Sequence, residues 1–548
     1  MNRHIGFFTA YQPHVELGQD GIGRLMIYIL KGMLNNGDRV TILAPSWHRG
    51  EVKKLLKEYS LEKSVKIKTT RWHAPVMLLI YDLLLWNKYR NKEELPQVME
   101  EKDSFAVLEL LKKLFYRLMA SYSFLVFFLF VIVTLALGIV LFPVWILILP
   151  LWLFKNWFFN KIDASSVRGG EGGTGFFSKK LKQYLSFAPR GLRSDTVVLG
   201  IMNAARASEL KRMLKYVNKG DIDLWYVPSI FWKEVLKIKK KRVIVVPDLV
   251  YAEFPHLYCI DAVMQWSSQS LDRILKEKPK IVCYSNHVKE RHLVQLRDVK
   301  PGSVTVIPHG VVDLSEHLRM GLPPKEIIQV YLNKHARSIP NGAFVKEFNF
   351  DDAKFIIYSS QYRYHKNIVG LLYALEKLIR RDHVNLVLVL TCANYQFLTP
   401  YLEKLNLLRE VIFMPKVPES VLAALNHFAV LHVNPSLFEG GFPFTFNEAY
   451  SVGTPSVMAN IPVTREYVDD ELAKTMLFDP YDVEDIVNKI KWGMAHRDEL
   501  LALEKPLFEK FASRTWDIVA EEYVNAMSYS YRRKLPKRKR KPWKRKRS

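Results

Sequence analysis

The chain has 548 residues, of which 49% are hydrophobic and 25% are charged, and its formal net charge is +25. This composition is typical of globular proteins, so it excludes a wholly disordered chain, and the length indicates two or three domains. Twelve basic residues lie between Arg532 and Arg547, so the rest of the chain carries +13 (25 minus 12), and the charge alone does not indicate a nucleic-acid-binding protein.

The first 50 residues predict a parallel α/β unit. Strands are expected at 4–10 and 40–44, with an apolar-periodic helix at 22–34 between them. Gly21 and Gly23 lie where the first strand meets this helix, and glycines there let a ligand approach the backbone closely. No apolar segment follows a basic start, so no cleaved secretion signal is expected and this part should remain in the cytoplasm.

The next feature is an apolar segment at 118–154 that contains no charged side chain. It exceeds the roughly 20 residues that span a bilayer. Gly138, Pro143 and Pro150 interrupt it, which favours two shorter helices with a bend over one long helix. Basic residues flank both ends, so both ends are expected on one side. We therefore expect a membrane hairpin, spanning or re-entrant, on the cytoplasmic side of a membrane; a buried core helix is the alternative.

An α/β pattern resumes after a glycine-rich linker at 168–175. Strands are expected at 196–201, 224–228, 242–246, 281–284 and 304–308. If these strands share one sheet with the first two, both ends of the apolar segment must lie on the same side of the membrane. The cysteines, Cys259, Cys283 and Cys392, have no metal-ligand spacing and indicate core positions in a reducing compartment, with a disulfide or zinc site as the alternative.

A second α/β region begins near residue 353. Strands are expected at 355–358, 384–391, 411–414 and 429–433, and helices at 368–380 and 421–428. Arg363 and Lys366 follow the first of these strands, so they could form a cationic clamp at the carboxyl edge of the sheet, where open α/β sheets bind ligands. Two solvated surface cations are the alternative.

The loop after the strand at 429–433 contains Glu439, Gly440 and Gly441, and the helix that follows contains Glu448. Backbone N–H groups of such a loop and a helix N-terminus can bind a phosphate, while carboxylates accept hydrogen bonds from hydroxyls. Phosphate and sugar hydroxyls together suggest a nucleotide-sugar. A glycosidase also uses paired acids, but that reading explains neither the cationic clamp nor the two α/β regions.

These motifs together resemble those of the retaining GT-B glycosyltransferases of family 4. They are Arg363-x-x-Lys366-Asn367, the turn at 308–311, the Asn434-Pro-Ser436 segment, the two glutamates and Gly453-Thr-Pro455. The resemblance covers about 1–50 and 195–528. It implies an α/β fold with two Rossmann-like domains facing a cleft, and the apolar segment adds a membrane hairpin inserted in the first. The expected division is an N-terminal acceptor domain at 1–110 and 190–335, an insertion at 111–189, a C-terminal nucleotide-sugar domain at 336–510, a crossing helix at 511–528 and, from its charge, a disordered basic tail at 529–548.

The resemblance also implies roles for individual residues. Arg363 and Lys366 would neutralise the donor diphosphate, and Glu448 would accept hydrogen bonds from the ribose hydroxyls. Glu439, as a catalytic candidate, and the backbone of Gly440, Gly441 and Phe442 would contact the donor sugar and phosphates, while Gly21 and Gly23 would approach from the N-terminal domain.

Three positions depart from the family pattern. Eight residues separate the two glutamates where the family has seven, Gln361 stands where the family places its arginine, and Asp248 stands where a His-Asp pair is more familiar. Asp248 is the acceptor-side catalytic candidate, with a structural role as the alternative.

Fixed cations and helix N–H groups can stabilise the diphosphate leaving group, so neither a metal nor a cofactor beyond the donor is expected. The basic tail could bind nucleic acid, act as a solvated tail or contact anionic membrane lipid; lipid is the favoured partner and nucleic acid the least favoured. The expected function is sugar transfer to a lipid-linked or membrane-associated glycan acceptor, as in polysaccharide or lipopolysaccharide biosynthesis. The alternative is a non-catalytic, membrane-tethered binding protein that recruits a partner or nucleic acid through its tail.

Overall fold

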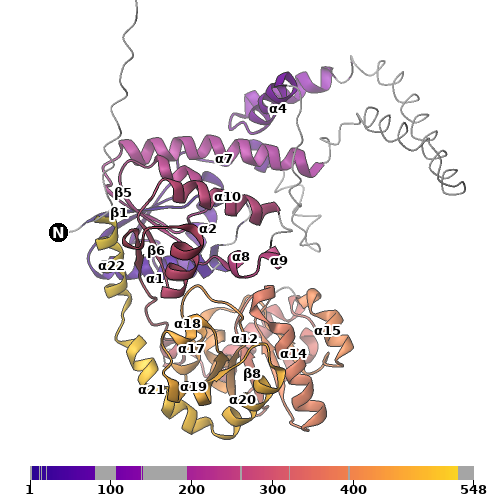
Figure 1. Cartoon of the computed structure of the whole chain (residues 1–548). Helices are drawn as coiled ribbons and strands as arrows, with labels where there is room; N and C mark the ends of the chain where they lie inside the picture. Colours follow the sequence, from indigo (N-terminus) through magenta and orange to yellow (C-terminus); the bar gives the residue numbers. More distant parts are fainter. Residues whose placement is uncertain are drawn as a thin grey trace, which may run out of the picture.

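The computed structural model describes residues 3–79, 106–139, 194–258, 262–319, 321–392 and 395–528, apart from residues 12, 14, 16, 20 and 138. They form two α/β domains, drawn one above the other in Figure 1. Each domain is built on a sheet of parallel strands with helices packed around it. The prediction of two parallel-sheet α/β domains is therefore confirmed.

The N-terminal domain contains a seven-stranded sheet in the order β3-β2-β1-β4-β5-β6-β7. Its central pair, β1 and β4, joins segments from either side of the predicted insertion, with Ile5 opposite Leu224. The chain thus leaves this sheet after β3 and returns to the same sheet. The strands are β1 (His4–Phe8), β2 (Arg39–Leu43), β3 (Val65–Lys68), β4 (Leu224–Val227), β5 (Lys241–Val245), β6 (Ile281–Cys283) and β7 (Val304–Val306).

The helices of this domain cover both faces of the sheet (Figure 1). One face buries the apolar side of α1, including Met26, Ile29 and Leu30, against β1 and β2. The opposite face buries α7 residues such as Met213 and Val217. The helices are α1 (Gly21–Asn35), α2 (Arg49–Glu58), α7 (Ser194–Lys219), α8 (Val250–Glu253), α9 (Pro255–Tyr258), α10 (Ala262–Lys276) and the π-helix η5 (Val288–Gln295).

The strand predicted at 196–201 is wrong, because these residues lie inside α7. Tertiary packing overrides the β-branched composition of this short segment. Gly200 lies against the ring of Tyr116 in α4 (Ala106–Met119), where a Cβ would be 2.3 Å from a ring carbon. Ile201 and Ala205, one helical turn apart, join Ala120 in a small apolar cluster. Strand β3 was not predicted.

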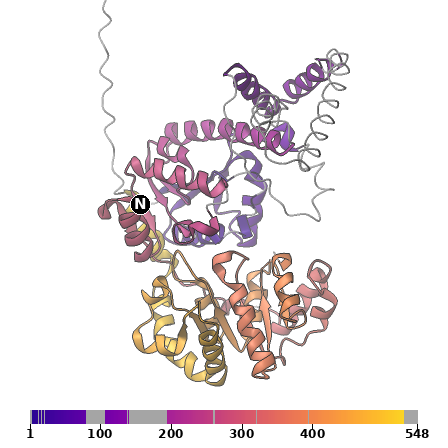
Figure 2. The same cartoon turned by 45° about the vertical axis from the view of Figure 1, so that its right-hand side comes forward.

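The described part of the insertion consists of α4 and a second helix over 124–137, which lie beside α7 at the end remote from the C-terminal domain (Figure 2). Among the described residues, no helix is both long and apolar enough to cross a membrane. The structure therefore gives no support to the predicted hairpin. Its first residues, 118 and 119, end α4, which packs on α7, while residues 140–154 lie outside the described part.

The C-terminal domain has a six-stranded sheet in the order β10-β9-β8-β11-β12-β13. All four predicted strands are present, and β12 and β13 extend the sheet beyond them. The strands are β8 (Phe355–Tyr358), β9 (Val387–Leu390), β10 (Val411–Phe413), β11 (Leu431–Asn434), β12 (Ser456–Ala459) and β13 (Leu477–Phe478).

Helices pack on both faces of this second sheet. Helix α12 contacts α16, although the predicted division at 335/336 assigned its residues to the N-terminal domain. The helices are α11 (Ser315–Arg319), α12 (Pro324–His335), α13 (Gly342–Glu347), α14 (Ile368–Glu376) with its π-helical continuation η9 (Lys377–Arg381), α15 (Thr399–Lys404), α16 (Glu419–Phe428), α17 (Phe444–Tyr450), α18 (Pro462–Arg465), α19 (Asp470–Met476), α20 (Val483–Ala495) and α21 (Arg497–Ala512).

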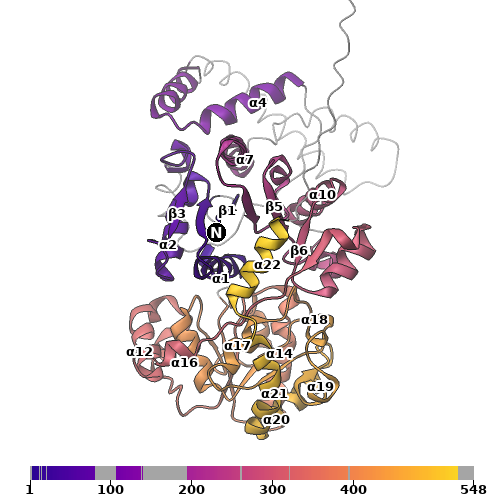
Figure 3. The ribbon, with the colours of Figure 1, turned by 90° about the vertical axis from the view of Figure 1, so that its left-hand side faces the viewer.

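The last described helix, α22 (Trp516–Ser528), returns to the N-terminal domain (Figure 3). It contacts α1, β4 and β5, and it buries Val519, Tyr523 and Val524 in the core of that domain. The crossing helix predicted from 511 is thus divided, because 511 and 512 complete α21 and a break at 513–515 precedes α22.

Both sheets reverse their strand order beside their first strand, between β1 and β4 and between β8 and β11. In open α/β sheets, ligands bind outside the carboxyl ends of the strands at such a switch point, because the flanking helices diverge there. The loops after β8 and β11 are therefore where a site is expected in the C-terminal domain.

Candidate active site

Lys366 and Glu439 meet at the switch point of the C-terminal sheet. Lys366 follows β8 and Glu439 follows β11, and the ammonium Nζ donates a hydrogen bond of 2.6 Å to Oε1 of Glu439. The two side chains are only 19% and 16% exposed. The sequence prediction that both belong to one site agrees with this contact.

The environment of Lys366 keeps it charged. Burial opposes the ammonium form, but the Glu439 carboxylate and the Tyr358 hydroxyl outweigh it, so the pKa of Lys366 is raised. Asp248 of the N-terminal domain contributes in the same direction. A fixed positive charge at this position can stabilise an anion that develops next to it.

Glu448 is paired with a residue of the other domain. Its carboxylate is almost fully buried, and its Oε1 accepts a hydrogen bond of 2.8 Å from Arg24 of α1. Burial disfavours the guanidinium, yet the carboxylates of Glu448 and Glu419 hold the pKa of Arg24 well above its usual value. The residue predicted to bind ribose thus lies in an ion pair that joins the two domains.

Glu419, at the start of α16, completes this network. Its Oε1 accepts hydrogen bonds from Arg24 at 3.1 Å, from the Tyr28 hydroxyl at 2.7 Å and from the Tyr59 hydroxyl at 3.0 Å. Burial alone would raise its pKa, but His317, Arg24 and the two hydroxyls lower it to about 2. Three side chains of the N-terminal domain therefore bind one carboxylate of the C-terminal domain; we call Arg24, Glu419 and Glu448 the interdomain clasp.

The glycine loop packs directly against the N-terminal domain. A Cβ on Gly440 would lie 2.1 Å from the carbonyl oxygen of Pro247, and one on Gly441 would lie 2.8 Å from Nε2 of His309. The hydroxyl of Ser285 also donates a hydrogen bond of 2.8 Å to the Gly440 carbonyl. The glycines therefore permit a close approach, here of the opposite domain's backbone.

His309 is enclosed between aromatic rings at this contact. Its ring centroid is 4.3 Å from that of Tyr284 and 4.6 Å from that of Phe444, at the start of α17. Burial, assisted by the charge of Arg514, lowers the pKa of His309 to about 3. The imidazole is thus neutral at physiological pH.

Arg363 lies in the loop after β8, three residues before Lys366, and its side chain is exposed. It forms no ion pair with any residue that the structure describes, while the neighbouring His365 is largely buried and lies 2.7 Å from the Tyr258 hydroxyl through Nδ1. Burial and the charges of Lys366 and Arg363 lower the pKa of His365 to about 3. Arg363 therefore remains a solvent-facing cation beside the Lys366 pair.

Asp248 faces the glycine loop from the end of β5. A Cβ on Gly440 would lie 2.9 Å from the Cβ of Asp248, and one carboxylate oxygen of Asp248 accepts a hydrogen bond of 3.4 Å from the backbone of Val250. The acceptor-side candidate and the loop of the donor-side candidate are therefore adjacent across the domain contact.

Two predicted residues, Gly23 and Phe442, have packing roles. Gly23 is buried in the first turn of α1, where a Cβ would lie 2.0 Å from the carbonyl oxygen of Leu17, whereas Gly21 is exposed with open space around it. The ring of Phe442 is buried in the C-terminal core and stacks on Phe511. Of these three residues, Gly21 and the backbone of Phe442 therefore remain as candidates for contact with a ligand.

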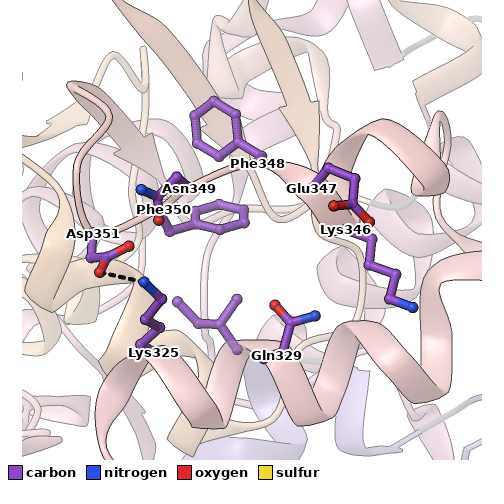
Figure 4. Close-up of a pocket in the computed structure, with 9 residues that line it drawn as sticks. Lys325, Gln329, Lys346, Glu347, Phe348, Asn349, Phe350 and Asp351 are labelled. Atoms are coloured by element: carbon purple, nitrogen blue, oxygen red, sulfur yellow. Dashed lines mark hydrogen bonds and ion pairs between the residues drawn. The ribbon is translucent and has the colours of Figure 1, made fainter.

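A hollow on the surface lies away from these residues (Figure 4). It is formed by α12 and the segment 346–351, and an ion pair of 2.8 Å between Lys325 and Asp351 closes one side. None of the predicted site residues lines it.

Sequence reasoning missed Arg24 and Glu419 of the interdomain clasp, and the two tyrosines, Tyr28 and Tyr59, that donate hydrogen bonds to Glu419. Arg24 directly follows the Gly21-Ile-Gly23 motif, which is a local signal that a cation stands at the start of α1. Its partners lie 395 and 424 residues away in the sequence, so only the packing of the two domains identifies them.

Comparisons of the sequence with known proteins find similarity to glycosyltransferases. Residues 343–505 match the family model described as Glycosyl transferases group 1. An uncharacterized glycosyltransferase of Methanocaldococcus jannaschii is 26% identical over 178 residues, which are 32% of this chain and 45% of that protein. The matched part therefore spans about half the length of this relative.

Solved structures resemble the whole architecture. The Anabaena protein HepE in complex with UDP and glucose has a TM-score of 0.54 at 12% identity, covering 96% of this chain and 100% of that chain. Sucrose-phosphate synthase of Thermosynechococcus elongatus has a TM-score of 0.51 at 13% identity, covering 96% and 98%. The chain thus has a GT-B-type fold, and its C-terminal domain carries a glycosyl transferases group 1 domain.

Proposed function

We propose that this protein is a glycosyltransferase that moves a sugar from a nucleotide-sugar to a lipid-linked or membrane-associated glycan acceptor. The observation that carries the proposal is the Lys366–Glu439 pair at the switch point of the C-terminal sheet. Its support is the match of this domain to the glycosyl transferases group 1 model and the likeness of the fold to a structure that holds UDP and glucose.

In the proposed reaction the charge of Lys366 acts on the leaving group. The bond between the anomeric carbon and the diphosphate oxygen breaks, and its electron pair stays with the diphosphate. Lys366 and the nearby Arg363 stabilise this growing negative charge more than they stabilise the bound donor, which lowers the barrier. These cations supply the charge stabilisation without a metal ion.

We propose that transfer retains the anomeric configuration. The acceptor hydroxyl oxygen forms its bond on the face from which the diphosphate departs, and its proton passes to the departing phosphate oxygen. Glu439 lies next to Lys366, so its carboxylate can accept hydrogen bonds from the donor sugar. Asp248 faces the same loop from the acceptor domain and is the candidate for contacting the acceptor.

In this proposal the ribose hydroxyls compete with Arg24 for the carboxylate of Glu448. Its carboxylate is paired with Arg24, so ribose hydroxyls reach it only if the guanidinium moves or shares the carboxylate. Donor binding is then coupled to the relative position of the two domains, because Arg24 and Glu448 belong to different domains.

The membrane part of the proposal rests on the helix over 124–137. Large apolar side chains are exposed on it, including Leu125 at 78%, Leu129 at 60% and Ile132 at 62%. Several exposed apolar side chains on one helix are typical of an interaction site. The sequence continues with further uncharged residues to 154. We propose that this helix contacts lipid on the cytoplasmic side of a membrane, together with the basic residues of 532–547.

Turnover measurements test the proposed activity. The full-length protein is incubated with a panel of nucleotide-sugars, and both release of the free nucleotide and thermal shifts are followed, because a cognate donor stabilises the folded state by mass action. We expect one donor to raise the melting temperature and to be consumed. A donor that stabilises but is never consumed, with or without extracts of membrane lipid as acceptor, supports the rival binding protein.

Flotation with vesicles tests the membrane contact separately. We expect Leu125→Glu combined with Ile132→Glu to weaken binding to all vesicles, and deletion of 532–548 to weaken only the salt-dependent binding to anionic vesicles. Binding that neither change affects would remove the membrane from the proposal and leave the transfer reaction unaffected.

A further inference from the structure

A cluster of two histidines and one glutamate lies in the N-terminal domain, outside the site described above. Nε2 of His287 is 3.0 Å from Oε1 of Glu253, and Nε2 of His292 is 2.7 Å from the same oxygen. The three ligand atoms lie within 4.8 Å of one another. Both imidazoles thus point their outer nitrogens at one carboxylate oxygen.

The backbone between the histidines is a π-helix, η5 (Val288–Gln295), capped by His287. Residues five apart point in clearly different directions on an α-helix, since five steps of 100° turn by 140° beyond one full circle. The wider π-helical turn instead brings the rings of His287 and His292 to a centroid separation of 5.1 Å. A π-helical segment is rare and is often found at functional sites.

The cluster is buried on the side of His292 and exposed to solvent on the side of Glu253. His292 is fully buried and stacks on Phe438, the residue before Glu439, at a centroid distance of 5.5 Å. The Glu253 side chain is 30% exposed. Glu466 fixes the start of the π-helix, because its carboxylate accepts hydrogen bonds of 2.9 Å and 2.6 Å from the backbone N–H groups of Asn286 and His287.

Each imidazole of the cluster has a second ring nitrogen, which can carry the ring proton when Nε2 binds an ion. Nδ1 of His292 has no hydrogen-bond partner in the described part of the chain, so no existing bond there opposes the transfer of the proton to it.

We propose that Glu253, His287 and His292 bind a divalent transition-metal ion of the zinc type. Two imidazoles and one carboxylate are a ligand set that zinc accepts, with water in the fourth position, here on the exposed side of Glu253. Binding moves each imidazole proton from Nε2 to Nδ1, and it widens the present 3.0 Å and 2.7 Å separations from Oε1 of Glu253, because the ion replaces the two hydrogen bonds.

The ion would connect α8 to the π-helix directly beneath Phe438. Phe438 belongs to the C-terminal domain but is buried in the apolar core of the N-terminal domain. A metal ion at this position would therefore restrict the motion of the N-terminal residues that surround the Phe438 ring. The role is structural and does not depend on the proposed transfer reaction.

Zinc binding to the full-length protein tests this site. After treatment with a chelator and its removal, Zn²⁺ is titrated by calorimetry, and Co²⁺ is added in parallel to record the visible absorption of a tetrahedral complex. We expect one equivalent of Zn²⁺ to bind and to raise the melting temperature. Absence of saturable zinc binding would overturn the proposal.

Two variants of the cluster and one control variant test whether the measured zinc binding occurs at the cluster. His287→Ala and Glu253→Gln change side chains that are not fully buried, and each should weaken zinc binding by more than about 100-fold, since even an outer-shell partner contributes about 10- to 100-fold. The control is His335→Ala, an exposed histidine at the end of α12, which should bind as the unaltered protein does. Binding that survives both cluster variants would show an adventitious site elsewhere and would also overturn the proposal.

Discussion

The two carboxylates predicted to bind the donor differ in where their partners come from. Glu439 is paired with Lys366 of its own domain, whereas Glu448 is paired with Arg24 of the opposite domain. Both members of the first pair belong to one domain, whereas the second pair exists only when the two domains are in contact. In the proposed enzyme, the phosphate-binding half of the donor site is therefore preformed, while the ribose-binding half depends on domain position.

The largest effect is expected from Lys366→Ala. Removing a preorganised charge from a developing anion should lower turnover by about 10²- to 10³-fold, as removal of one oxyanion donor does. Nucleotide release under donor saturation measures this. Turnover close to that of the unaltered protein would show that Lys366 does not act on the leaving group.

Glu448→Ala tests the interdomain pair. We expect the free energy of unfolding to fall by about 3 kcal/mol, because the Arg24 guanidinium is left partly buried with Glu419 as its remaining carboxylate. Denaturant unfolding gives the value, and Glu471→Ala serves as control, since that carboxylate is 85% exposed.

Adding Arg24→Met to Glu448→Ala sharpens the same test. If the loss comes from an unpaired cation, replacing the cation by an apolar side chain of similar length should recover part of the stability. A double variant that is less stable than Glu448→Ala alone would contradict this explanation.

Gly440→Ala separates the domains without altering a charge. Its Cβ would lie 2.1 Å from the Pro247 carbonyl oxygen, so the backbones must move apart, and we expect a loss of about 2 kcal/mol. Gly302→Ala is the matched control, because nothing lies within 4 Å of a Cβ at that position. Equal stabilities of the two variants would show that the glycine loop tolerates a wider domain contact.

Lowering the pH should reduce the stability of the domain contact at the glycine loop, because His309 is buried there. Its folded-state pKa of about 3 lies below the ordinary value of 6.5, so the unfolded state binds the proton more readily and stability is lost as pH falls from 6.5 toward 3. At pH 5.5 this loss is about 1.4 kcal/mol. Unfolding curves at pH 7.5 and 5.5 measure it; His309→Gln should flatten the dependence, and exchange of the exposed His383 for Gln should not.

The smallest effect is expected at a surface pair of the C-terminal domain. Lys377 and Glu484 lie 2.5 Å apart but are 35% and 45% exposed, so Lys377→Ala should change stability by less than about 1 kcal/mol and leave turnover unaffected. A larger loss of stability would mean that burial does not explain why the Arg24–Glu448 pair is expected to contribute more to stability than the Lys377–Glu484 pair.

The sequence alone determined the two parallel α/β domains and placed Lys366 and Glu439 at the same edge of the C-terminal sheet, where they form a hydrogen bond. Alternation of apolar strands and helices sets the sheet direction, and residues that follow neighbouring parallel strands meet at the same edge. Local pattern failed at 196–201, where a β-branched segment forms part of α7 because α4 packs against it.

Only the tertiary structure decided the partners across the domain contact. Arg24 and Glu448 are 424 residues apart, and the meeting of His287 and His292 depends on a π-helical turn that no spacing rule encodes. The physical reason is that local propensities fix elements a few residues at a time, whereas these contacts arise from close packing of whole domains and from the need to pair every buried charge.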